Sequence, residues 1–279
     1  MKGRFLSAGR IAAAVTLVAL SPVAARCQIA PTLTAQPVLP PEAITPDLQS
    51  AAPASPGPMD SGSGFARLLR DVGGDYKGFF SKGVALRLGI GGAAAGIAHI
   101  WDSDVANEAA EPLPPPTELL DGGDFYGGPS GQWPLAIGWW AIGHFSHSAA
   151  GADAGRDLLR AQISAASWTY LIKFATNRQR PNGDPRAFPS GHTSATFATA
   201  TVLQQHYGWR VGVPFYLLGV YAGASRITAE KHWVSDVVFG AAVGVASGYT
   251  VTRRIRTHTV TLSPAIYPGG VGLSVNLDR

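Results

Sequence analysis

Apolar residues in this chain gather in long segments that contain few polar positions and many small residues. Six such segments, separated by breaks rich in Gly and Pro, cover residues 83–101, 133–148, 154–179, 192–207, 211–225 and 232–252. Most of them are longer than a typical strand, and Gly and Pro mark the ends of helices. The pattern predicts an all-α fold, a bundle of about six core helices whose small residues permit close contacts.

Two regions interrupt this helical pattern. Residues 102–132 contain "EPLPPPTE" and "DGGDFYGGPSG", which predict a loop. Near the C-terminus, apolar residues alternate at Val271, Leu273, Val275 and Leu277, after a Pro-Gly-Gly turn at 268–270. Alternation with a period of two predicts a short β-hairpin in the tail, residues 257–279.

The N-terminal region has the composition of an export signal followed by a linker. Lys2, Arg4 and Arg10 flank an apolar stretch of about ten residues, which is typical of a secretory signal and short for a membrane anchor, the alternative interpretation. We therefore expect a signal peptide over 1–25, a linker rich in Pro, Ala and Ser over 26–64, and a folded domain over 65–256. The single cysteine, Cys27, excludes an internal disulfide.

Charge and span length narrow the class of protein. Only residues 233–251 reach the roughly 20 apolar residues of a membrane span. We expect an exported domain, periplasmic or membrane-associated, that contacts a membrane surface at most and whose active site lies outside the cytoplasm. The net charge of +4 suits anionic partners, but the chain has no Lys/Arg run of the nucleic-acid-binding type. Soluble and membrane-embedded forms, and the oligomeric state, stay open.

The first stretch whose residues could carry chemistry is "KFATNRQRP". Lys173 and Arg180 are seven residues apart, so two helical turns would place them on one face. Pro181 disfavours helix at Arg180, which predicts that Arg180 lies at the helix end and turns inward. Taken alone, such a pair is a solvated basic helix end, and Arg178 is interpreted in that way.

The second stretch is "PSGH", which opens the segment 192–207. Ser190 is a good helix cap, and the amides around Ser190, Gly191 and His192 would face an anion at the helix N-terminus. His192 could then donate a proton beside that anion. The alternative is an ordinary cap followed by a surface histidine.

The third stretch is "SRITAEKHWVSD". His232 follows Arg226 by six residues, and Asp236 follows His232 by four, on the same face of a predicted helix. A carboxylate at that spacing holds one imidazole nitrogen and leaves the other free as a nucleophile or ligand. In isolation, a surface His-Asp pair is the alternative.

The three stretches together resemble the type 2 phosphatidic acid phosphatase (PAP2) superfamily, which also includes bacterial acid phosphatases and vanadium haloperoxidases. The chain carries the order Lys-x6-Arg-Pro, Pro-Ser-Gly-His and Ser-Arg-x5-His-x3-Asp over residues 173–236. By this resemblance His232 is the nucleophile and forms a phosphohistidine, Asp236 orients it, and His192 protonates the leaving alkoxide and then activates water. The resemblance assigns the phosphate-binding role to Lys173, Arg180, Arg226, Ser190 and Gly191.

The resemblance implies a phosphatase that acts on a phosphorylated lipid, an isoprenoid pyrophosphate or a soluble ester. Three cations and a helix N-terminus can stabilise the phosphoryl oxygens without a metal, so no cofactor is expected, although vanadate could occupy the same pocket. The alternatives are a vanadium-dependent haloperoxidase and a non-catalytic module that binds an anion or a lipid.

Overall fold

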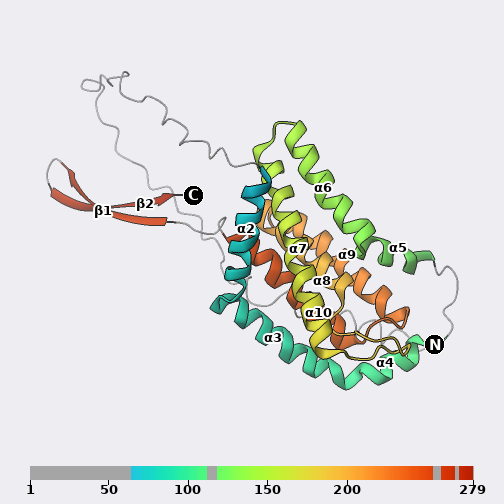
Figure 1. Cartoon of the computed structure of the whole chain (residues 1–279). Helices are drawn as coiled ribbons and strands as arrows, with labels where there is room; N and C mark the ends of the chain where they lie inside the picture. The colour runs from blue at the N-terminus through green and yellow to red at the C-terminus, as the bar shows by residue number, and fades with distance from the viewer. Residues whose placement is uncertain (1–63, 112–117, 254–258, 268–269, 279) are drawn as a thin grey trace.

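The computed structural model of the chain describes residues 64–111, 118–253, 259–267 and 270–278. The predicted signal peptide, nearly all of the predicted linker and Cys27 lie outside these residues. Within them the fold is a bundle of helices, as the apolar pattern predicts (Figure 1).

The long helices run roughly along one direction, with α8 at the centre of the bundle (Figure 1). α8 packs against α7, α9 and α10, while α6 lies along α7 and α3 lies along α10. The helices are α2 (Gly64–Phe79), α3 (Lys82–Ala98), α4 (Asp102–Ala109), α5 (Glu118–Gly127), α6 (Pro129–Phe145), α7 (Ala149–Thr176), α8 (Gly191–Tyr207), α9 (Trp209–Thr228) and α10 (Val234–Val251).

Small side chains set the distance between α8 and α10. The core of the bundle contains many alanines and valines, with Phe197 of α8 as a large and fully buried side chain. At Gly244 of α10 the backbone of α8 is so close that an added Cβ would lie 2.3 Å from the carbonyl oxygen of Ser194. The run of small residues in 192–207 and 232–252 is therefore required by the close contact of these two helices.

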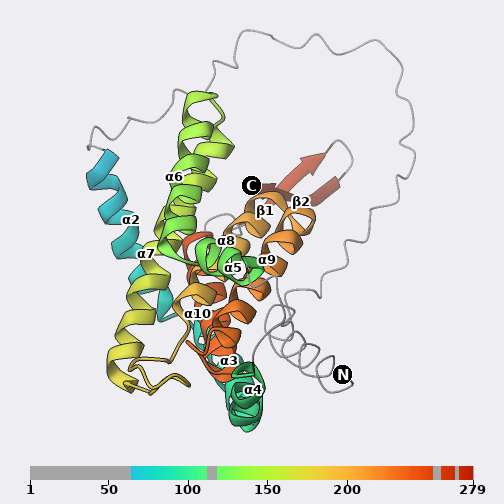
Figure 2. The same ribbon diagram turned by 90° about the vertical axis from the view of Figure 1, so that its right-hand side faces the viewer.

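The predicted loop over 102–132 is wrong in part, because this region contains α4, α5 and the start of α6. α5 forms although its sequence holds two adjacent glycines, which disfavour a helix. Those glycines let α5 approach α9 closely: a Cβ on Gly123 would lie 2.6 Å from the Cβ of Ser225 (Figure 2). Packing against α9 therefore outweighs the low intrinsic helix propensity. α2 likewise forms a helix that the apolar pattern did not predict.

The tail forms the expected hairpin. Strands β1 (Thr259–Tyr267) and β2 (Gly270–Asp278) pair antiparallel, with Thr259 opposite Asp278 and Tyr267 opposite Gly270.

Two helical stretches are long and apolar enough to cross a membrane, judged by length and composition alone. They are Lys82–Ala109, which joins α3 to α4 through a 3-10 turn, and Val234–Val251. The sequence pattern predicts only the second. Val234–Val251 is mostly buried inside the bundle, as the core helix of any helical protein would be, whereas Lys82–Ala109 is mostly exposed.

The contact between α8 and α10 generates a stability prediction. In Gly244→Ala the new methyl group collides with the Ser194 carbonyl oxygen, and we expect a loss of about 1–3 kcal/mol in the free energy of unfolding. Gly89→Ala is the matched control, because nothing lies within 4 Å of its added Cβ. We expect this control to be neutral or more stable by up to about 1 kcal/mol. Chemical denaturation followed by circular dichroism measures both, and equal stability of the two variants would contradict the assigned contact.

Candidate active site

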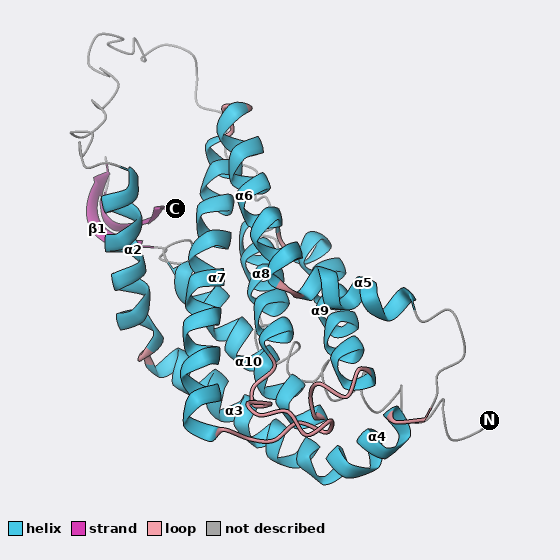
Figure 3. Ribbon diagram, turned by 45° about the vertical axis from the view of Figure 1, so that its right-hand side comes forward, coloured by secondary structure: helices cyan, strands magenta, loops and turns pink. Residues whose placement is uncertain are grey.

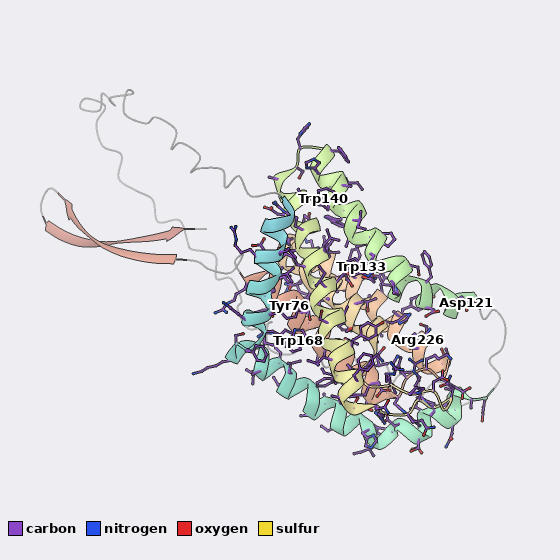
Figure 4. All side chains as sticks on the ribbon, in the orientation of Figure 1. Tyr76, Asp121, Trp133, Trp140, Trp168 and Arg226 are labelled. Atoms are coloured by element: carbon purple, nitrogen blue, oxygen red, sulfur yellow. The ribbon has the colours of Figure 1, made fainter. Side chains whose placement is uncertain are left out.

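A cavity of about 490 Å³ opens at the end of the bundle where α7 ends and α8 begins. It is lined from α6, α7, α8 and α9, from the connection between α7 and α8, and from the turn before α10. Arg226 lies at this end of the molecule, whereas Trp140 lies at the other end of the long α6 helix (Figure 4). Six of the residues selected from the sequence line this cavity: Lys173, Arg180, Gly191, His192, Arg226 and His232.

Lys173 and Arg180 reach the cavity from different elements. α7 ends at Thr176, and Asn177 in the left-handed conformation (φ 42°) turns the chain away, so the two residues do not share a helix face as the sequence predicts. Lys173 Nζ donates to the carbonyl oxygens of Arg186 (2.7 Å) and Ala187 (3.2 Å). Burial, together with the smaller effect of nearby Arg180, lowers the pKa of Lys173 to about 8. The lysine remains largely protonated at neutral pH.

The start of α8 provides amides to the cavity, but not from every predicted residue. Ser190 is fully buried and caps the helix through its hydroxyl, and its amide donates to the carbonyl oxygen of Asp236 at 2.9 Å. Ser190 is therefore a structural residue, and its predicted role as a phosphate ligand is not supported by this geometry. Gly191 and His192 are the first residues of α8, where amides have no acceptor inside the helix and the helix dipole favours an anion.

His192 faces a carboxylate from α5. Its Nε2 lies 2.7 Å from Oδ1 of Asp124, and the same carboxylate oxygen accepts a hydrogen bond from Arg226. Burial lowers the pKa of His192, Arg226 lowers it further, and Asp124 acts in the opposite direction. Asp124 is about half exposed, so solvent can reach this ion pair from the mouth of the cavity.

The turn between α9 and α10 places His232 beside Arg226. Arg226 lies in the last turn of α9, and its carbonyl oxygen accepts from the amides of both Lys231 (3.0 Å) and His232 (3.2 Å). Within the described part of the chain, the Nε atoms of Arg180 and Arg226 are buried and have no hydrogen-bond partner. Two guanidinium groups with unused donors in one cavity favour an anionic ligand.

His232 and Asp236 lie close together, although not on one helix face. α10 begins at Val234, so His232 precedes the helix, and Asp236 in the first turn accepts from the amide of Trp233 at 2.9 Å. This bond folds the chain back until Nδ1 of His232 lies 3.5 Å from Oδ2 of Asp236. Burial lowers the pKa of His232 to about 4, against the opposing effect of Asp236. The ring is therefore neutral at physiological pH, and its Nε2 carries a lone pair or a proton toward the cavity.

Sequence reasoning missed the roles of two charged residues at this end of the bundle. Asp124 lies in a region predicted to be a loop, and nothing in its local sequence marks it. Arg178 is not the solvated residue that we expected, because it forms ion pairs with both Asp102 and Asp236. These contacts join segments more than 50 residues apart, so no local spacing pattern could reveal them.

Comparison with known proteins finds a family model that covers most of the residues lining this cavity. The model of the PAP2 superfamily matches residues 155–259. A lipid A 1-phosphatase of Porphyromonas gingivalis is 42% identical over 80 residues, which are 27% of this chain and 18% of that protein. A lipid A 4'-phosphatase of Helicobacter pylori is 30% identical over 81 residues, 29% of this chain and 41% of that protein. The chain thus spans less than half the length of these relatives.

The fold has a match among solved structures. The crystal structure of a transmembrane PAP2 type phosphatidylglycerolphosphate phosphatase from Bacillus subtilis superposes with a TM-score of 0.50 and 19% identity, covering 68% of this chain and 92% of that one. This likeness concerns the arrangement of helices, and the family model covers most of the residues that line the cavity. Over residues 155–259 the chain is similar to the PAP2 superfamily.

Proposed function

We propose that the protein is a metal-independent phosphatase that hydrolyses phosphomonoesters through a phosphohistidine. The observation that carries this proposal is the convergence of three cations, a helix N-terminus and two histidines on one cavity. The charge of a phosphoryl group in transfer is spread over its equatorial oxygens, so catalysis consists mainly of positioning and electrostatic stabilisation. Lys173, Arg180, Arg226 and the amides at the start of α8 supply that stabilisation without a metal ion.

The first chemical step is an attack by His232. Its Nδ1 faces Asp236, so the neutral ring presents Nε2 to phosphorus. A P–N bond forms while the P–O bond to the alcohol breaks, and His192 Nε2 gives its proton to the departing alkoxide. Asp236 orients the ring and stabilises the positive charge that develops on it.

The second step returns the enzyme to its starting state. His192, now neutral, takes a proton from a water molecule whose oxygen attacks phosphorus. The P–N bond breaks, His232 regains its neutral form, and orthophosphate leaves. Asp124 must release His192 Nε2 and Arg226 when a phosphate binds, because the phosphoryl oxygens require the same donors. Asp124 is thus a competitor of the substrate in the resting cavity.

We further propose that the substrate is a lipid phosphate. Trp133 of α6, which Figure 4 labels, lines the cavity together with Ala166 and Tyr170 of α7, and these three residues form an apolar wall. This wall continues onto the outer face of α7, where Leu171 and Phe174 are exposed. The lipid A phosphatases named above are similar to this chain over about 80 residues, which favours a substrate of lipid type. When the phosphate group of a lipid is held among the cations, the apolar chains of that lipid lie against this wall. The protein would then act at a membrane surface outside the cytoplasm.

The proposed nucleophile is tested by His232→Ala. We expect phosphate release from phosphatidate in mixed micelles to fall by at least about 10³-fold, because no other group replaces the nucleophile. Acid quenching of the wild type with ³²P-labelled substrate should trap an acid-labile phosphoprotein that the variant lacks. His144→Ala, an exposed histidine on α6, is the matched control.

Three results would contradict the proposed function. They are full activity of His232→Ala, absence of phosphate release by the folded wild type, and halide oxidation with added vanadate and peroxide in place of phosphate release. Activity that EDTA abolishes would contradict the metal-independent mechanism.

The pKa shifts predict an acidic optimum for kcat/KM. Activity requires neutral His232, so it should fall as the pH drops through about 4. Activity also requires protonated His192, whose lowered pKa makes activity fall as the pH rises through a value below 6.5. In Asp124→Asn the carboxylate no longer favours protonated His192, so the basic limb should move to lower pH. The KM should also decrease, because the competitor is gone. A basic limb that stays in place would contradict the assigned ion pair.

The apolar wall predicts a selective effect of Tyr170→Ala. We expect kcat/KM for phosphatidate to fall by about tenfold, because roughly 1.5 kcal/mol of apolar contact is lost. The value for glycerol 3-phosphate, which has no acyl chain, should not change. Leu217→Ala removes an exposed apolar residue of α9 that does not line the cavity, and serves as the control. An equal loss with both substrates would contradict lipid binding at this wall.

A further inference from the structure

Arg178 joins two carboxylates that come from distant parts of the chain. Its Nη1 donates to Oδ1 of Asp236 at 2.7 Å, and its Nη2 donates to Oδ2 of Asp102 at 2.7 Å. The guanidinium also lies over the ring of Trp233, 5.4 Å from its centroid. Figure 3 shows the loop that carries Arg178, between α7 and α8, passing close to α4 and to the start of α10.

The contacts of Asp236 fix the rotation of its carboxylate. Oδ1 accepts from Arg178, while Oδ2 accepts from the amide of Trp233 and faces Nδ1 of His232. If Arg178 were absent, Oδ1 would have no charged donor and the carboxylate could turn about its Cβ–Cγ bond. The arginine therefore determines which oxygen is presented to the histidine.

Asp102 holds Arg178 in turn. This aspartate is the first residue of α4, is only 3% exposed, and accepts from both the amide (2.9 Å) and the hydroxyl (2.6 Å) of Ser235. Ser235 follows Val234, the first residue of α10, so Asp102 caps α10 from another helix. A buried carboxylate is costly unless it is paired, and here the partner is the guanidinium that also serves Asp236.

We propose that Arg178 and Asp102 are positioning residues for the nucleophile: together they hold the Asp236 carboxylate so that His232 presents Nε2 to phosphorus. This inference rests on the proposed function. It adds to the reaction two residues that do not line the cavity. It also assigns a role to α4, whose first residue links the exposed Lys82–Ala109 stretch to the catalytic histidine.

The charged groups around Arg178 and Asp102 determine how these two residues affect the protonation of His232. Lys173 and Arg180 face His232 from the cavity side, and Asp236 faces it from α10. Arg178 lies behind Asp236, Asp102 lies behind Arg178, and His99 contacts Asp102 at 2.7 Å from the exposed side. Replacing Arg178 by a neutral residue makes this environment more negative, so protonated His232 becomes easier to form. Replacing Arg178 by Lys keeps the charge but loses the planar fork that reaches two carboxylates at once.

Two variants separate orientation from charge. In both Arg178→Met and Arg178→Lys we expect kcat for phosphatidate to fall by about 10–100-fold with little change in KM, as for other supporting residues of a catalytic group. Only in Arg178→Met should the acidic limb of kcat/KM move to higher pH. Asp102→Asn, which keeps the arginine, should lower kcat without that upward shift.

Two further measurements keep the proposal distinct from its alternatives. NMR titration of ¹⁵N-labelled His232 follows the same shift without any turnover, so the charge effect can be tested even if the proposed phosphatase activity fails. Arg160→Met is the matched control. Arg160, like Arg178, pairs with two carboxylates, those of Asp75 and Asp157, but it lies 13 residues before Lys173 on α7, roughly 20 Å along the helix.

A positioning role and a purely structural role predict different results for these variants. A positioning role predicts that Arg160→Met loses stability without moving the His232 titration, whereas Arg178→Met moves it. Unchanged kcat in Arg178→Met and Asp102→Asn would overturn the proposal. So would losses of kcat that match the control and leave the His232 titration in place.

Discussion

One hydrogen bond joins the two segments that carry the proposed catalytic histidines. The amide of Ser190, at the start of α8, donates to the carbonyl oxygen of Asp236, at the start of α10. It brings the N-termini of α8 and α10 together, so that the first residues of α8 and the turn before α10 line the same cavity. A Cβ on Gly240 would lie 2.6 Å from the Ser190 carbonyl oxygen, so the junction also requires a glycine. The placement of His192 relative to His232 follows from this junction.

The cavity combines positive charge with low solvent access. Cations that are near one another repel, and burial disfavours each of them, which explains the lowered pKa values of Lys173 and His232. The protein offsets part of this cost with Asp124 at the mouth and Asp236 behind the histidine. An incoming phosphate dianion relieves the remaining repulsion. The resting site is thus electrostatically unfavourable in the absence of an anion, and a ligand of that charge has a correspondingly greater gain on binding.

The sequence predicted the bundle and six of the residues that line the cavity for identifiable reasons. The long apolar segments are too long for strands and are separated by Gly and Pro. The motif residues lie at the ends of these segments, and the ends of packed helices come together at one end of a bundle. What could not be predicted depends on contacts between distant segments. α5 contains glycines that local propensity assigns to a loop, yet packing on Ser225 makes it helical. The sequence around Arg178 is typical of an exposed residue. Its two carboxylate partners, Asp102 of α4 and Asp236 of α10, come from distant segments that only the folded chain brings beside it.

Lys173 donates to two main-chain carbonyl oxygens, and this has a consequence for alkaline solution. An ammonium group has three N–H bonds, and a neutral amine keeps two of them. When the pH rises above about 8 the side chain loses its charge but retains enough protons for both carbonyls. The connection between α7 and α8, which Lys173 anchors, can stay in place while the attraction of this side chain for an anion disappears. Alkali would then weaken the hold on the ligand before it loosens the architecture around it.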